Sequence, residues 1–357
     1  MTHPRFNTRV SFDPSDTEKI FTLISSIDIV KGQWRLTQKL SPQMIKRLTQ
    51  SVLITSAGSS NRIEGNKMTD EEIKNLYSKL RIKKFKDRDE QEVAGYLEML
   101  QVVFESFSSI NLTEGTVLQF NGEILKYTDK DKGNRGKYKF GSNQVLAKDA
   151  QGNIVQVIFD PTPPYLAPKE TRELVEWTNW ALEIGFKHPL IIIANFIFEF
   201  LAIRPFEDGN GRTSRVLTNL LLLKQGYDFV PFVSHEQIIE SSKVDYYMAL
   251  NKTQRTWKQT QENISPFVIF FLEVVNQQAQ KALQILSQDD TQSFLSEKQN
   301  QVWQYALSVC TLSRKDVINA TNLNPRTVEE SIKKLLNMNK LEKIGQSSAT
   351  RYKVIVV

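Results

Sequence analysis

The sequence contains a single cysteine among its 357 residues. Cys310 has no partner for a disulfide within the chain, which excludes a fold stabilised by internal disulfides. Long apolar runs are also missing, since residues 190–197 and 220–223 fall far short of the roughly 20 residues of a membrane-spanning helix. The N-terminus leads into no apolar run of the signal-peptide type. We therefore expect a soluble cytoplasmic protein without a membrane partner.

A large excess of one charge is lacking as well. The chain has 46 Lys and Arg against 40 Asp and Glu, which gives a formal net charge of +6. Residues 291–357 hold ten basic and five acidic side chains, so +5 of this charge lies in the last 67 residues. If nucleic acid is a partner, the contact is expected in this C-terminal segment.

The length fits two or three globular domains, and helical periodicity dominates most of the chain. We predict a mostly α fold with an N-terminal helical extension at 1–110, a core at 111–286 and a small domain at 294–357. Prolines at positions 4, 14 and 42 predict an irregular opening. A basic run at residues 81–88 is interpreted as a solvated loop or helix face rather than a binding patch.

One region before the C-terminus has β character. Residues 137–140 and 145–146 predict short strands, 149–153 a turn, and 154–159 a further strand. Together they predict a small hairpin, followed by a stiff connector rich in proline.

A polar loop at residues 203–215 joins two apolar segments that predict buried helices. Gly209 and Gly211 can adopt backbone angles that direct successive amides at one point, which makes an anion-binding nest. A helix that begins near Arg212 would add its unpaired N-terminal amides.

The charged residues of the loop suit the same type of ligand. Arg212 and Arg215 would lie on roughly one helix face and could clamp phosphate oxygens. Asp208 offers hard oxygen ligands for a phosphate-bound Mg²⁺. The loop therefore predicts a site for a phosphate-bearing ligand and a divalent metal.

The whole string, IRPFEDGNGRTSR, is more specific than its parts. It resembles the signature of the Fic (Fido) family, His-Pro-Phe-x-Asp/Glu-Gly-Asn-Gly-Arg-x-x-Arg. The matching residues are Pro205, Phe206, Asp208, Gly209, Asn210, Gly211, Arg212 and Arg215. Arg204 stands where the signature has histidine. The resemblance covers roughly residues 112–283 and implies a Fic-type helical core, with the hairpin as the family's flap that aligns a target's backbone.

The usual reaction of that family transfers AMP from ATP to a hydroxyl side chain of a target protein. The resemblance thus implies ATP and Mg²⁺ as cofactors, a protein with a Ser, Thr or Tyr hydroxyl as partner, and Asp208 as the metal ligand. The nucleotide-binding residues that it implies are Phe206, Gly209, Asn210, Gly211, Arg212, Arg215 and Tyr247. Gly209, Asn210 and Gly211 would line the phosphate nest, Arg212 would hold the outer phosphates, and Phe206 would anchor the loop.

A second motif lies in the N-terminal extension. Residues 60–65, SNRIEG, are similar to the family's inhibitory motif, Ser/Thr-x-x-x-Glu-Gly/Asn, with Ser60, Glu64 and Gly65 at its defined positions. By resemblance, Glu64 pairs with Arg215 and keeps it from the γ-phosphate. Apart from the resemblance, Ser60 and Glu64 would form an ordinary i,i+4 pair on a helix surface.

Arg204 separates three functional hypotheses. An arginine is effectively always protonated and cannot accept the hydroxyl proton. General-base catalysis contributes about 10²–10⁴-fold, so Arg204 at the catalytic position should strongly weaken transfer without preventing binding. The hypotheses are an AMP transferase restrained by Glu64, a nucleotide-binding Fic scaffold coupled to a DNA- or partner-binding domain, and a hydrolase in which Glu64 positions water to remove AMP.

Residues 294–357 predict three helices followed by a hairpin, which looks like a winged helix-turn-helix domain. The candidate DNA contacts are Arg326, Thr327, Lys333 and Lys334 on the recognition helix and Arg351 on the wing. Such domains also serve in dimerisation or docking, so DNA binding and a homodimer both stay open.

Overall fold

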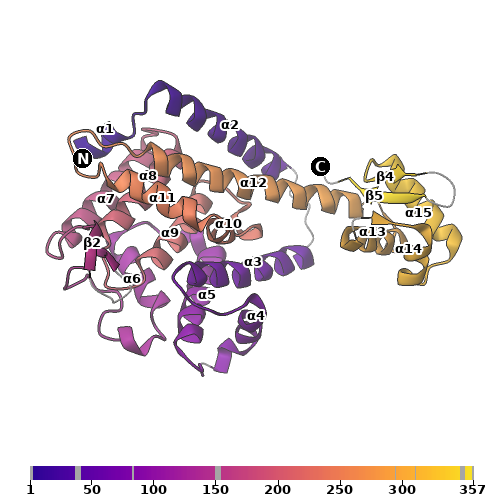
Figure 1. The fold of residues 1–357 in the computed structure, drawn as a ribbon, viewed down its shortest axis with the longest axis horizontal. Coiled ribbons are helices and arrows are strands. Elements are labelled where there is room, and N and C mark those ends of the chain that lie inside the picture. Colours follow the sequence, from indigo (N-terminus) through magenta and orange to yellow (C-terminus); the bar gives the residue numbers. More distant parts are fainter. Residues whose placement is uncertain are drawn as a thin grey trace. The chain divides into compact units, whose positions relative to one another are not determined.

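The computed structural model describes residues 3–36, 42–82, 84–148, 154–293, 295–309, 311–345 and 350–355, which are mostly helical (Figure 1). The chain divides into two compact units, Met1–Ala282 and Leu283–Val357. In the part of the chain described, no helix is both long and apolar enough to cross a membrane.

Among the residues described, the first unit contains eleven α-helices and the first part of a twelfth, up to Ala282. They are α1 (Pro4–Arg9), α2 (Pro14–Leu36), α3 (Pro42–Ile63), α4 (Asp70–Lys79), α5 (Arg88–Ser106), α6 (Glu114–Ile124), α7 (Ala167–Glu183), α8 (Pro189–Ile203), α9 (Asn210–Lys224), α10 (His235–Ser241), α11 (Lys243–Gln254) and α12 (Ser265–Ser293). The prediction of an irregular opening was wrong. Pro4, Pro14 and Pro42 each begin a helix, because proline fits the first helical position, whose amide has no helical partner.

Helices α8 and α9 form the centre of the first unit, as the two apolar segments predict. α8 is apolar on all sides and is buried from Leu190 to Ile203, as expected of a helix that other elements surround. α7 packs on α8, α5 and α6 pack on α9, and α3 lies against α5, α9 and α10. This packing sets the loop between α8 and α9 on a rigid base.

The predicted hairpin is confirmed in part. β1 (Val145–Lys148) pairs with β2 (Ile154–Phe159) in antiparallel register. Residues 137–140 are not a strand, because this segment bonds to the central loop instead: Lys139 N donates to Pro205 O at 2.9 Å. The predicted turn at 149–153 lies outside the described residues.

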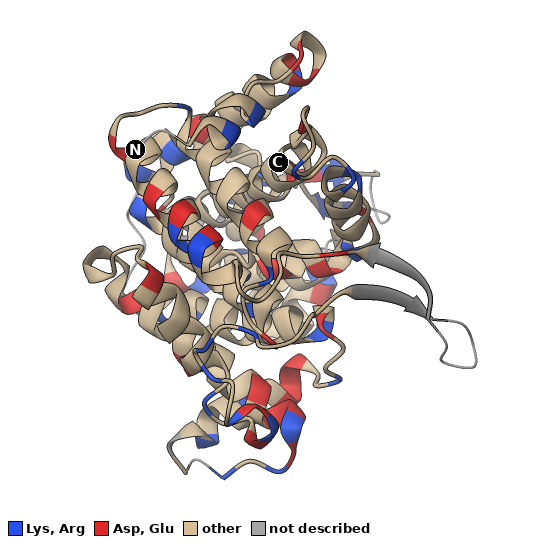
Figure 2. Ribbon diagram, turned by 90° about the vertical axis from the view of Figure 1, so that its left-hand side faces the viewer, with Lys and Arg blue, Asp and Glu red and all other residues tan. Residues whose placement is uncertain are grey.

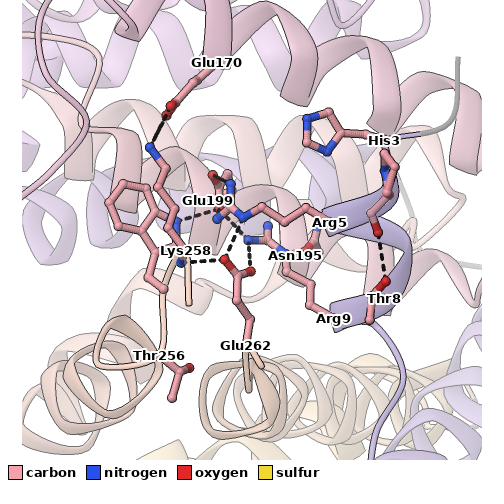
Figure 3. A network of polar contacts seen from close by, with 12 residues as sticks. His3, Arg5, Thr8, Arg9, Glu170, Asn195, Glu199, Thr256, Lys258 and Glu262 are labelled. Carbon is pink, nitrogen blue, oxygen red and sulfur yellow. Dashed lines mark hydrogen bonds and ion pairs between the residues drawn. The ribbon is translucent and has the colours of Figure 1, made fainter. Parts of the chain in front are cut away.

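An ion cluster ties α1 to α8 (Figure 3). Arg9 donates from Nη1 to Glu199 at 2.6 Å and to Glu262 at 3.1 Å, and from Nε to Asn195 Oδ1 at 2.7 Å. Arg5 pairs with the same two carboxylates at 2.9 and 2.6 Å. Glu199 is buried on α8 four residues before the central loop begins, so the N-terminal helix helps to fix the helix that carries the loop.

The second unit has its own apolar core around Trp303, Leu312 and Leu335. Its helices are α13 (Glu297–Val309), α14 (Arg314–Thr321) and α15 (Pro325–Asn337), and its strands are β3 (Thr311–Leu312), β4 (Leu341–Ile344) and β5 (Arg351–Val354). The strands form an antiparallel sheet in the order β3-β5-β4. The three predicted helices and the hairpin are confirmed, and β3 was not predicted; the winged-helix assignment stays a prediction.

Candidate nucleotide site

The loop between α8 and α9 is held closed by its own asparagine and by the segment before β1. Asn210 accepts from Phe206 N at 3.0 Å and donates to Phe206 O at 2.8 Å. Asn143 Nδ2 donates to Arg204 O and Phe206 O at 3.1 and 2.8 Å. Phe206 is buried and packs against Phe200 with ring centroids 6.1 Å apart, so its side chain lies in the core below the loop.

Asn210 was expected to line the phosphate nest, and this stays a prediction. Both polar atoms of its side chain bond to Phe206, so Asn210 offers a ligand its backbone amide. Gly209, with φ of +82°, turns the chain into α9. The first amides of that helix, at Asn210, Gly211 and Arg212, have no helical partner and supply the nest.

A cavity of about 980 Å³ opens beside this helix terminus. The loop and the start of α9 line one side, including Arg204, Asp208 and Gly211, and α11 lines another with Tyr246 and Tyr247. Tyr247 is 43 % exposed and Tyr246 is buried behind it. The volume suits a nucleotide-sized ligand, with amides and charges at one end and aromatic rings at the other.

Arg215 is buried at the base of the site. Its guanidinium donates to Glu64 Oε1 at 2.7 Å, and to Ser60 Oγ and Ser60 O at 2.7 and 2.8 Å. Burial opposes the charge on Arg215, but the Glu64 carboxylate together with the neighbouring Tyr246 and Tyr96 outweighs this effect and raises the pKa of Arg215. The two motifs that lie about 150 residues apart in sequence therefore meet in one ion pair.

Glycine is required where Glu64 approaches α9. A Cβ on Gly211 would overlap Glu64 Oε1, so a larger residue there would displace the carboxylate. At the end of α3, Gly65 has a φ of +100°, which turns the chain away from the cavity directly after Glu64. The Glu64 side chain remains 36 % exposed, since it projects into the open cavity.

Asp208 lies at the mouth of the nest between two arginines. Oδ1 accepts from Arg212 Nη2 at 2.9 Å and Oδ2 from Arg88 Nη2 at 3.1 Å. Among the described residues there is no group of three or more His, Cys, Asp or Glu that could hold a metal alone. A single carboxylate beside a phosphate nest nevertheless fits Mg²⁺, which usually binds through one or two carboxylates together with substrate phosphates.

Two supporting residues were missed by sequence reasoning. Asn121, fully buried on α6, donates to Asp208 O at 2.9 Å and accepts from Gly136 N at 3.1 Å, so it joins the loop to the segment before the hairpin. Lys139 Nζ donates to Ile203 O at 3.1 Å and to Asn143 Oδ1 at 2.8 Å. Burial, and then the charge of Arg204, lower the pKa of Lys139 to about 8. A polar residue at helical spacing gives no signal of such long-range contacts.

A buried carboxylate beneath the site was also missed. Glu236 on α10 accepts from Ser56 on α3 at 2.8 Å, from Tyr96 on α5 at 2.9 Å and from Asn219 on α9 at 2.8 Å. Burial disfavours its charge, but the neighbouring His235 and these donors hold the pKa of Glu236 below its usual value. Glu236 therefore fixes α3, which carries Glu64, against α9, which carries Arg215.

Arg204 ends α8 in the left-handed region, with φ of +47°. Its side chain lines the cavity, and its Nε is buried without a hydrogen-bond partner among the described residues. The position expected to carry the proton acceptor thus presents a cation to the ligand.

The residues proposed for DNA contact lie on the second unit. Arg326, Lys333 and Arg351 are exposed, and Thr327 and Lys334 are partly buried. Arg326 pairs with Glu330 at 3.1 Å and Arg351 with Asp316 at 3.5 Å. Basic and acidic residues are interspersed along the ribbon (Figure 2). The two ion pairs reduce the positive potential that DNA would meet.

Comparisons with known proteins agree with this geometry. Residues 111–222 match the Fic/DOC family. The chain is 26% identical over 232 residues to a protein adenylyltransferase Fic of Nematostella vectensis, an alignment that covers 63% of this chain and 48% of that protein. It is 37% identical over 83 residues to a probable protein adenylyltransferase of Aquifex aeolicus, covering 23% and 25% of the two chains.

Solved structures show the same fold. A Fic family protein from Desulfovibrio desulfuricans superposes with a TM-score of 0.58 and 22% identity over 97% of both chains. Fic-1 from C. elegans superposes with a TM-score of 0.57 and 18% identity over 77% of this chain and 73% of that one. The chain spans about half the length, or less, of the curated relatives it matches. Residues 111–222 therefore resemble a Fic/DOC domain, and the chain shares its helical fold with solved Fic proteins.

Proposed function

We propose that this Fic/DOC domain binds ATP with Mg²⁺ and transfers AMP to a hydroxyl side chain of a target protein, under restraint by Glu64. The observation that carries the proposal is the 2.7 Å ion pair between Glu64 and Arg215 at a helix terminus that opens into a nucleotide-sized cavity. The names of the adenylyltransferase relatives support the reaction class.

Different residues of the site would bind different parts of the ligand. The amides at the start of α9 hold phosphate oxygens, and Arg212 adds a fixed positive charge because Asp208 and Glu92 orient it. Mg²⁺, when bound at Asp208, would neutralise charge on the phosphates. Arg215 can reach the outer phosphate only after it leaves Glu64, so the ion pair sets the fraction of ATP bound in the productive orientation.

Arg204 limits the chemical step. The hydroxyl of the target must lose a proton as it attacks the α-phosphate, and a guanidinium cannot take it. Lys139 does not replace the base, because it does not line the cavity and its Nζ donates two hydrogen bonds away from it, to Ile203 O and Asn143 Oδ1. We therefore expect the wild-type chain to bind ATP well and to transfer AMP slowly.

Incubation with α-labelled ATP tests this proposal with four proteins: wild type, Glu64→Gly, Arg204→His and the double variant. We expect weak labelling of lysate proteins by wild type and strong labelling by the double variant, with the two single changes each accounting for part of the gain. Glu64→Gln is the matched control for side-chain size, since it removes the charge and keeps the length.

The alternative is a nucleotide-binding scaffold, and Arg204 is the observation that favours it. In that case calorimetry would detect ATP binding by wild type, and the double variant would label no protein even with a supplied target. Strong labelling by wild type would show instead that the reaction does not depend on a base at position 204.

For the second unit we propose DNA binding as a second role. Retention on DNA should be lost when residues 291–357 are deleted; if the full chain is not retained either, this role is wrong.

A further inference from the structure

Four charged side chains of alternating sign form a ring at the metal side of the cavity. Arg88 Nη2 contacts Asp208 Oδ2 at 3.1 Å and Arg88 Nε contacts Glu92 Oε1 at 2.7 Å. Arg212 contacts the remaining oxygens, Asp208 Oδ1 at 2.9 Å and Glu92 Oε2 at 3.4 Å. Each carboxylate is thus shared between the same two guanidiniums.

The two arginines of the ring differ in how firmly they are held. The side chain of Arg212 is 3 % exposed and Glu92 is 11 % exposed, so this half belongs to the core. Arg88 is 45 % exposed and Asp208 is 36 % exposed, so their contact faces water. An exposed ion pair is worth about 0–1 kcal/mol, which means that Arg88 can leave Asp208 at little cost.

The position of Arg88 conflicts with metal binding. Oδ2 of Asp208 is the oxygen that Arg212 leaves free, and Arg88 occupies it. A divalent cation at that oxygen would meet the guanidinium both as a competitor for the same lone pairs and as a like charge at close range.

We propose that Arg88 acts as a resident cation on Asp208, which a divalent metal must displace when it binds with the nucleotide. Arg88 thereby weakens metal binding in the resting state and sets the metal concentration at which the site fills. This inference rests on the proposed function, since it takes Asp208 as the metal ligand. It also adds to the expectation for the basic run at 81–88: its last residue, Arg88, is solvated as expected and in addition reaches the central loop.

The test compares two dissociation constants for α,β-methylene-ATP, which cannot donate AMP, on the full-length chain. Calorimetry measures one constant with EDTA and the other with saturating Mg²⁺, and their ratio gives the gain in nucleotide affinity due to the metal. If Arg88 also contacts phosphate directly, that contact changes both dissociation constants by the same factor and cancels in their ratio. We expect Arg88→Gln to raise the ratio about 3- to 10-fold, as the competitor and its like charge are removed together.

Lys86→Gln is the matched control, because it removes one positive charge from the same exposed segment without touching Asp208. Its ratio should equal that of wild type, whereas an equal rise in both variants would overturn the proposal in favour of a general effect of net charge. An unchanged ratio in Arg88→Gln would also overturn it and would leave the proposed function standing. A ratio of one in all three proteins would mean that Mg²⁺ does not change the nucleotide affinity. That result would overturn both this proposal and the assignment of Asp208 as the metal ligand.

Discussion

The buried ion cluster between α1 and α8 makes Arg9→Met the most informative single change for stability. The Arg9 side chain is 1 % exposed and contacts two carboxylates, Glu199 and Glu262, as well as Asn195. Methionine fills a similar volume but supplies no charge or donor. Arg5 remains on both carboxylates, so the variant keeps one of two cations in a site that water hardly reaches.

The expected cost follows from the carboxylate that loses its partner. Burial alone would raise the pKa of Glu199, but Arg9 and Arg5 lower it from 4.5 to about 2. This net difference, which remains after the opposing effect of burial, corresponds to about 3 kcal/mol of stability at neutral pH. A second estimate comes from other proteins, in which removing one partner from a buried ion pair costs roughly 3–5 kcal/mol. We therefore expect Arg9→Met to lower the free energy of unfolding by about 3 kcal/mol.

The direction of the Glu199 pKa shift determines how the stability difference between the two proteins changes with pH. A carboxylate whose folded pKa is depressed stabilises the fold above its unfolded pKa and loses this contribution as the pH falls. For Glu199 the window runs from about 4.5 down to about 2. The difference in stability between wild type and Arg9→Met should accordingly be full at pH 7 and should shrink as the pH is lowered through 4.5.

Differential scanning calorimetry of the full-length chain at pH 7 and in acid measures both effects. A loss of about 3 kcal/mol corresponds to a decrease in Tm of roughly 6–12 °C. Lys19→Met is the matched control, since Lys19 forms an exposed ion pair with Glu273 and should change Tm by no more than about 2 °C. A Tm of Arg9→Met within 2 °C of wild type, or a difference that does not shrink in acid, would refute the reasoning.

Three further predictions address the site. Asn121→Ala leaves Asp208 O and Gly136 N unpaired, so it should cost about 2–4 kcal/mol in calorimetry and reduce the effect of Mg²⁺ on ATP affinity; an unchanged Tm would contradict this. Glu236→Gln places an amide donor among groups that all donate to the carboxylate, and should lower the Tm by several degrees; a neutral result would mean that the network rearranges. The pKa of Lys139 is lowered to about 8, so the unfolded state binds more protons between pH 8 and 10.5, and stability from this group rises with pH in that window. Lys139→Met should remove that rise, by up to about 3 kcal/mol, and parallel stability curves for the two proteins would exclude it.

Much of the site could be predicted from the sequence, because it depends on short motifs with a local physical meaning. Two glycines and an asparagine between apolar segments were enough to place a helix terminus there. The contact between Glu64 and Arg215, at 2.7 Å in the structure, joins residues 151 positions apart and was implied by the resemblance to the Fic inhibitory motif. Local spacing alone predicts only a surface pair of Ser60 and Glu64.

The parts that were missed depend on contacts between distant residues. Arg5 and Glu199 lie 194 positions apart, and Tyr96 and Glu236 lie 140 apart. Each of these residues alone looks like an ordinary polar position on a helix. The strand predicted at 137–140 failed for the same reason, as the β character of that segment was outweighed by hydrogen bonds from Lys139 to a loop more than 60 residues away.

The attachment of α3 determines how the proposed restraint can be released. Ser56 is bonded to the buried Glu236, and Arg62 holds Glu240 at 2.6 Å, so the helix is part of the core up to its last turn. Only the side chain of Glu64, beyond the helix end, is free to turn into the cavity. Release then needs a rotamer change of Glu64 and no departure of the helix, so we expect it to be reversible without unfolding. Ser60 would stay bonded to Arg215 in the released state, which would keep the guanidinium beside the nest while its contact with Glu64 is open.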